Sequence, residues 1–219
     1  MGITERKERQ RAELREQILA AARKIVLDEG FDALTMRKIG DAIEYSPATI
    51  YLHFENREAI GRALCGEAFE HLISYMGAVA QIEDPLERLK GIGRHYARFG
   101  LENPKEYKLL FMTDTAFLET LFGEISGTKD PDDPGERAFQ FVVDTVQACI
   151  DAGVIRPGDP VLIGEMAWTM VHGIVSLALT CRSALESPVE ELVATLCDTF
   201  ARGLATSPAH VASEVRSTT

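Results

Sequence analysis

Several hydrogen-bonding side chains gather in one short segment in the first quarter of the chain. Ser46, Thr49, Tyr51 and His53 carry groups that can donate to phosphates or to the edges of bases. Ala48, in the same segment, is small enough to let a helix approach base edges closely. The spacing therefore favours contact with nucleic acid, and a plain bundle of short helices is the alternative.

Helical periodicity recurs along the chain, and strand patterns are almost absent. The spacing predicts a first helix over about 9–29, stopped by Gly30, which tolerates left-handed dihedrals. Thr35 is suited to cap a second helix. Ser46 and Pro47 are typical of the start of a third helix, which should end near residue 52. A short turn between the second and third helices is the geometry of a helix-turn-helix.

The third helix is expected to turn Ile50 and Phe54 inward and its small or hydrogen-bonding residues outward. Asn56 is then suited to cap a long fourth helix that ends near Val79. Three helices of this kind position the outer face of the third for contact with a DNA groove.

The run from Thr35 to Gly40, followed by Tyr45 to Glu58, closely resembles the DNA-binding signature of the TetR family. The resemblance covers about residues 10–65. It implies eight DNA-binding residues: Thr35, Arg37, Ser46, Ala48, Thr49, Tyr51, His53 and Arg57. By that resemblance Thr35, Arg37 and Arg57 contact phosphates. Ser46, Ala48 and Thr49 lie at the mouth of the major groove. Tyr51 and His53 hold the DNA backbone.

Two positions depart from the family pattern. Glu44 occupies the turn position where the family usually has glycine. If the backbone there is left-handed, glutamate costs on the order of 1 kcal/mol. Tyr45 replaces a smaller aliphatic residue, so the packing beneath the third helix should be adjusted. The general role is kept, but the base preference does not follow from the resemblance.

The net charge of −11 is unevenly distributed. The first 65 residues are close to neutral, and the remainder carries nearly all of the excess acid. Only the first part is therefore expected to face phosphates. An interrupted basic run near the start has two interpretations, a DNA-binding arm or a solvated helix face: Arg6, Lys7, Arg9, Arg11 and Arg15.

The second part of the chain predicts further helices, the last three over about 136–151, 160–181 and 188–204. Trp168, His172 and Gly173 resemble the Trp-x-x-x-His-Gly signature of one TetR-family C-terminal subtype. This resemblance implies a homodimer in which the helices over 160–181 and 188–204 pair with their copies as a four-helix bundle. The apolar positions expected at that interface are Ile163, Met166, Met170, Ile174, Leu177, Leu192, Leu196 and Phe200.

Aromatic and sulfur-containing side chains of the middle helices suit a pocket for a hydrophobic small-molecule effector. The expected lining residues are Tyr96, Phe99, Phe111, Phe139, Met166, Trp168 and His172. For each of them an ordinary core position is the alternative. His172 is expected to be a packed, hydrogen-bonded histidine, and no set of further ligands supports a metal.

Several function classes lack their sequence signatures. The four cysteines are widely spaced in apolar helical contexts, which predicts reduced core residues in a cytoplasm and neither a zinc site nor disulfides. The motifs of nucleotide-binding, hydrolytic and metalloprotease sites are absent, so no catalytic residue, cofactor or enzyme activity is predicted. The apolar stretch 161–181 contains Glu165 and His172, which argues against a membrane span.

These patterns together predict an all-α protein. Residues 1–60 would form the three-helix DNA-binding domain, 61–206 the helical ligand-binding and dimerisation domain, and 207–219 a frayed tail. The expected function is that of a ligand-responsive, cytoplasmic regulator of transcription in bacteria, a repressor associated with the nucleoid. It would bind a pseudo-palindromic operator in double-stranded DNA as a dimer. The alternatives are a dimeric helical interaction protein without DNA binding and a small-molecule-processing enzyme.

Overall fold

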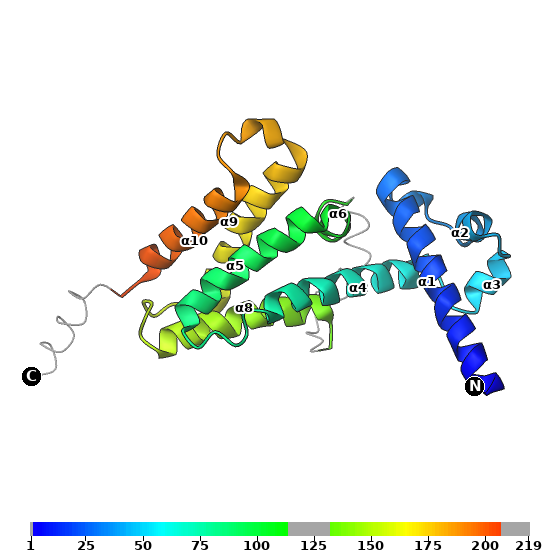
Figure 1. Cartoon of the computed structure of the whole chain (residues 1–219), viewed down its shortest axis with the longest axis horizontal. Helices are drawn as coiled ribbons and strands as arrows, with labels where there is room; N and C mark the ends of the chain where they lie inside the picture. The colour runs from blue at the N-terminus through cyan, green and yellow to red at the C-terminus, as the bar shows by residue number, and fades with distance from the viewer. Residues whose placement is uncertain (1, 114–131, 207–219) are drawn as a thin grey trace, which may run out of the picture. The chain divides into compact units, whose positions relative to one another are not determined.

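A computed structural model of the chain describes residues 2–113 and 132–206 (Figure 1). The regular structure of these ranges is helical, with one isolated antiparallel bridge between Ile155 and Ala205. The all-α prediction is therefore confirmed. The tail predicted over 207–219 lies outside the described residues.

The first part of the chain forms α1 (Ile3–Glu29), a 3-10 turn η1 (Phe31–Ala33), α2 (Met36–Ile43) and α3 (Pro47–Tyr51). As predicted, Gly30 ends α1 with a φ of 86°, and Thr35 caps α2 by accepting a hydrogen bond from the amide of Lys38. However, α1 begins six residues earlier than its apolar periodicity indicated. The added turns carry charged residues with high helix propensity, and these form a helix without an apolar face.

The next helices are α4 (Arg57–Gly77), α5 (Pro85–Glu102), α6 (Pro104–Phe111) and α8 (Pro134–Asp151). They are followed by α9 (Pro160–Thr180), a 3-10 turn η2 (Arg182–Ala184) and α10 (Val189–Leu204). Three of the described helices begin in the same way, with a capping side chain followed by proline at the first helical position. This arrangement occurs at Ser46-Pro47, Asp84-Pro85 and Asp159-Pro160.

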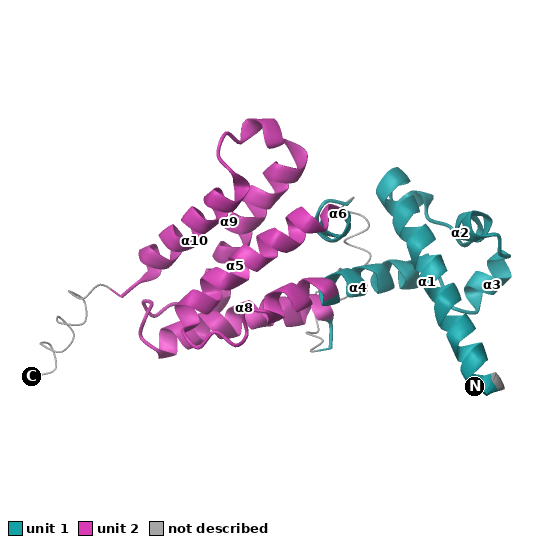
Figure 2. Cartoon of the chain, in the orientation of Figure 1, with its two compact units in different colours: residues 1–70, 105–133 teal, residues 71–104, 134–219 magenta. Residues whose placement is uncertain are grey.

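The chain divides into two compact units (Figure 2). Unit 1 comprises residues 1–70 and 105–133, and unit 2 comprises residues 71–104 and 134–219. The boundary predicted between residues 60 and 61 lies inside α4, whose first part groups with unit 1. The assignment of functional domains to 1–60 and 61–206 stays a prediction.

In unit 1, α2 packs against both α1 and α3. Ile18, Ile39, Ile50 and Ile60 are fully buried, and Phe54 is nearly so. Burying each such side chain stabilises the fold by about 1.5–3 kcal/mol, so the short helix α3 is held by packing rather than by its own propensity.

In unit 2, α5 packs against α8, α9 and α10, and α9 also contacts α8 and α10. The core of this unit is mainly aliphatic and includes Leu89, Val146, Val175 and Val193. Among the described helices, α9 alone is long and apolar enough to cross a membrane, a property that core helices of soluble proteins share.

The predicted core placement of the cysteines is correct for Cys65 and Cys149 and wrong for Cys181. Burial raises the pKa of the Cys65 thiol to about 12 and that of Cys149 to about 11, so both are protonated at neutral pH. Cys197 is half-buried, and burial raises its pKa as well. Cys181 is exposed because it follows the last residue of α9, where the chain leaves the helix.

Candidate nucleic-acid interface

The turn between α2 and α3 depends on one glycine. A Cβ added to Gly40 would lie 2.5 Å from the backbone oxygen of Tyr45, closer than real Cβ atoms come to any backbone atom. The amide of Tyr45 also donates to the Gly40 carbonyl over 2.9 Å. The absence of a side chain at Gly40 therefore lets α3 pack closely against the end of α2.

Glu44, the residue in the usual glycine position of this turn, is left-handed, with φ 61° and ψ 35°. It is the one non-glycine residue with positive φ in the described ranges. A non-glycine residue in this conformation costs roughly 1–2 kcal/mol. The turn thus has the left-handed backbone of a position where the family usually has glycine, and Glu44 carries a local strain there.

The outward face of α3 carries the side chains expected to meet DNA. Ser46 caps the helix by accepting a hydrogen bond from the amide of Thr49, and the two hydroxyl oxygens are 2.9 Å apart. Tyr51 is 58% exposed, and Leu52, directly after the helix, is 74% exposed. The inward prediction for Ile50 and Phe54 is confirmed. The helix therefore presents hydroxyl, phenol and aliphatic groups on a backbone that its inner face holds in place.

The two arginines predicted to contact phosphates differ in their surroundings. The side chain of Arg37 is 85% exposed, with Asp41 at 3.9 Å. The guanidinium of Arg57 lies 4.9 Å above the Phe31 ring and donates to Glu58 over 2.9 Å. Asn56 caps α4 through the amide of Ala59, as predicted, so Arg57 sits at a helix N-terminus, where an anion is favoured.

His53, just after α3, lies near two arginines of α1. Partial burial lowers its pKa below the usual value, and the positive charges of Arg11 and Arg15 lower it further. Arg15 also stacks over the Phe54 ring at 5.2 Å and donates to Glu67 over 3.1 Å. The sequence motif does not contain Arg11 or Arg15. Their i, i+4 spacing on the face of α1 that packs inward was the available signal.

In unit 2, three predicted effector-site residues form a hydrogen-bonded group. The indole nitrogen of Trp168 donates to the Tyr96 hydroxyl oxygen over 3.1 Å, and that oxygen lies 3.0 Å from Nδ1 of His172. Because an indole nitrogen only donates, the Tyr96 oxygen accepts from Trp168 while it also hydrogen-bonds to the imidazole of His172. Burial lowers the pKa of His172, in agreement with a neutral ring. Phe139 lies 6.4 Å from the Trp168 ring.

The other three predicted effector-site residues lie elsewhere. Phe99 is fully buried and packs edge-on against His71 and Tyr75. Phe111 belongs to unit 1, where its ring contacts those of Phe69 and Tyr107. Met166 is 45% exposed. No group of three metal-binding side chains occurs within residues 2–113 and 132–206.

Part of the predicted dimer stripe is also displaced. Ile163 is buried within unit 2, whereas Val161, Leu162, Met166 and Leu177 are exposed on α9. The prediction for Ile163 is wrong because α9 is apolar nearly all round, and periodicity alone does not show which side faces the bundle.

Comparisons with known proteins agree with these features. Residues 18–64 match the model for bacterial regulatory proteins of the tetR family. Residues 89–200, just over half of the chain, match the tetracyclin repressor-like C-terminal domain. The HTH-type transcriptional regulator UidR of Escherichia coli is 32% identical over 89 residues. That match covers 41% of this chain and 40% of the relative.

Solved structures share the fold. A TetR family transcription regulator from Marinobacter aquaeolei has a TM-score of 0.71 at 22% identity, over 91% of this chain and 100% of that one. A protein described as of unknown function from a Rhodococcus species has a TM-score of 0.67 at 26% identity. The second comparison covers 88% of this chain and 96% of the other.

Proposed function

This chain belongs to the TetR family of bacterial regulatory proteins, and on that premise we propose that it is a ligand-responsive transcriptional repressor. It binds a pseudo-palindromic operator in double-stranded DNA as a homodimer, in the cytoplasm of a bacterium. The eight DNA-binding residues are those predicted from the sequence, with Ser46, Ala48 and Thr49 toward the base edges and Tyr51 on the backbone.

One observation carries the DNA-binding proposal. The short helix α3 has a fully buried inner residue, Ile50, and an outer face of hydroxyl, phenol and small groups. A five-residue helix is not stable by itself, and packing against α2 is what makes it a fixed ridge. A fixed ridge with hydrogen-bonding groups on its outer face is what entry into a major groove requires.

The dimer proposal rests on the exposed apolar side chains of α9. Leu162, Met166 and Leu177 are each 45% exposed or more, and Thr169 and Gly173 lie between them on the same side of the helix. A symmetric partner would remove this apolar surface from water. A dimer also gives two recognition helices, which read two half-sites about one helical turn apart.

The effector proposal rests on the group formed by Tyr96, Trp168 and His172. A hydrogen-bonded polar group beside aromatic rings suits a hydrophobic molecule with a single polar end. An effector would change operator affinity only to the extent that it binds one conformation of the dimer better than the other.

The two alternative functions receive less support. A helical interaction protein that does not bind DNA has no need for an exposed Tyr51 on a capped recognition helix. For a small-molecule-processing enzyme, the Tyr96–His172 hydrogen bond would be the candidate site, and a structural hydrogen-bonded group accounts for it equally well. The family match favours the regulator over both.

The test is selection of duplexes from a random library with the full chain, followed by fluorescence anisotropy on the selected operator. We expect two inverted half-sites and an affinity that falls steeply as salt rises. Tyr51→Phe removes one hydroxyl and should weaken binding by about tenfold on operator and random duplex alike, at an unchanged melting temperature. A parent protein that is monomeric, or that ignores duplex DNA at low salt, would rule the proposal out.

A further inference from the structure

The first turns of α1 carry a face that the DNA-binding motif does not account for. Residues 4–13 are all exposed. Lys7 and Arg11 lie there at i, i+4 spacing, and the same helical face continues through Ile18, Ala22 and Ile25, which pack into unit 1. The face that is apolar where α1 is buried is thus basic where α1 extends beyond the packed core.

Helical geometry separates charges that alternate along the sequence. Glu5, Glu13 and Glu16 lie on the opposite side of α1, where Arg9 pairs with Glu13 over 3.4 Å. Glu8 borders the basic face and is its nearest carboxylate along the helix. Among the described residues, neither Lys7 nor Arg11 has a carboxylate within ion-pair distance.

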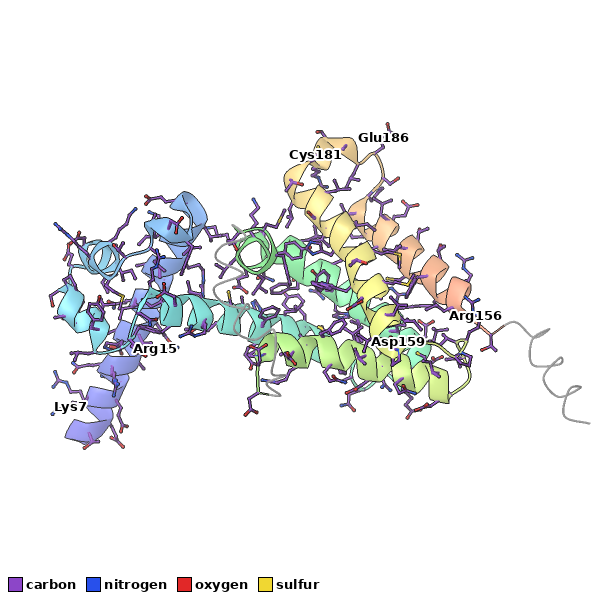
Figure 3. All side chains as sticks on the ribbon, turned by 180° about the vertical axis from the view of Figure 1, so that it is seen from behind. Lys7, Arg15, Arg156, Asp159, Cys181 and Glu186 are labelled. Atoms are coloured by element: carbon purple, nitrogen blue, oxygen red, sulfur yellow. The ribbon has the colours of Figure 1, made fainter. Side chains whose placement is uncertain are left out.

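The basic face points toward the end of the recognition helix. Arg15, one turn beyond Arg11, stacks on Phe54 at 5.2 Å (Figure 3 labels Lys7 and Arg15 on α1). The influence of Arg11 and Arg15 on His53 places both arginines on the side of α1 that faces the end of α3. Lys7 and Arg11 therefore extend the surface that begins at His53.

We propose that Lys7 and Arg11 bind backbone phosphates of the DNA beside the recognition helix, so that α1 is a second DNA-contacting element. This inference rests on the proposed function. Two cations without carboxylate partners, next to the groove-reading helix of a chain with net charge −11, are complementary to phosphate and not to the rest of the protein. Three of the four carboxylates between residues 5 and 16 lie on the opposite side of α1, which leaves the basic face open to an anion.

The experiment compares two double variants of the full chain that lose the same charge from the same helix. Lys7→Gln with Arg11→Gln removes the basic face, and Arg6→Gln with Arg9→Gln removes two cations from other sides of α1. All four positions are exposed, so both variants should melt at the temperature of the parent. Operator affinity is measured by anisotropy over a range of salt concentrations.

We expect the first variant to reduce the slope of log affinity against log salt by about 0.9 for each lost phosphate contact, or about two per protomer. The Arg6/Arg9 variant should keep the slope of the parent. Equal reductions in both variants, or none in either, would overturn the proposal. A parent that binds no duplex would instead refute the function on which it rests.

The location of the contacts is tested with operators that carry uncharged methylphosphonates at the phosphates flanking each half-site. These operators should bind the parent more weakly than the unmodified operator does. They should bind the Lys7/Arg11 variant almost as well as the unmodified operator, because this variant already lacks the cations that would contact the neutralised phosphates. If both proteins lose the same affinity, Lys7 and Arg11 do not contact the flanking phosphates.

Discussion

The recognition helix α3 and the apolar helix α9 both expose side chains. The sequence predicts which side of the helix is exposed better for α3 than for α9. In α3 the large apolar residue differs from its small or hydrogen-bonding neighbours, so the pattern alone placed Ile50 inside and Ala48 outside, whereas Thr49, also expected outside, is half-buried. In α9 nearly every residue is apolar or small, yet Ile163 is buried while its sequence neighbour Leu162 is 54% exposed. Polarity contrast within a helix, not hydrophobicity, is what makes its orientation readable.

The largest expected effect separates the two helices by function. Leu162→Glu combined with Leu177→Glu places charges on the exposed face of α9 and should dissociate the dimer, because a buried unpaired carboxylate is costly. Operator affinity should fall by more than about 100-fold as one recognition helix is lost. Sedimentation equilibrium and anisotropy measure the two consequences.

The matched change in the other region is Leu52→Glu, after α3, where the leucine is also exposed. It should weaken operator binding and leave the dimer intact. A double α9 variant that stays dimeric would show that the exposed face of α9 is not the interface.

The next effect concerns the hydrogen bonds by which Tyr96 of α5 joins Trp168 and His172 of α9. Tyr96→Phe removes the hydroxyl that links Trp168 to His172 and should lower the free energy of unfolding by about 1 kcal/mol. Chemical denaturation measures this loss. Tyr51→Phe, at an exposed tyrosine of α3, serves as the control and should leave stability unchanged. Equal stability of both variants would mean that the hydrogen-bonded group adds nothing to the fold.

A smaller effect tests the turn that positions α3. Glu44→Gly should raise the free energy of unfolding by about 0.5–1 kcal/mol, since relief of the left-handed strain exceeds the added chain entropy of glycine. Ala42→Gly, two residues earlier in α2, should instead lower it by about 1 kcal/mol. Thermal unfolding measures the stability of both variants. A Glu44→Gly protein less stable than the parent would contradict the strain assigned to Glu44.

The smallest effect is a pH dependence of DNA binding. Partial burial, with Arg11 and Arg15, holds the pKa of His53 below its usual value in the free protein, and a nearby phosphate would raise it. Binding would then take up a proton, so operator affinity should rise a few-fold as the pH falls from about 7.5 to about 6. His53→Gln should abolish the rise, and His95→Gln, in unit 2, should keep it. A rise that persists in His53→Gln would assign it to another group.

The sequence by itself determined the helical class, the caps at Thr35, Ser46 and Asn56, and the inward and outward residues of α3, because each depends on contacts within a few residues. Tertiary structure decided which side of α9 is exposed, that Phe111 and Phe139 belong to different units, and that Arg11 and Arg15 lie near His53. These facts depend on how distant helices pack. A uniformly apolar helix does not show which side is exposed, and the spacing of Arg11 and Arg15 gives their face of α1 but not the residue that this face meets.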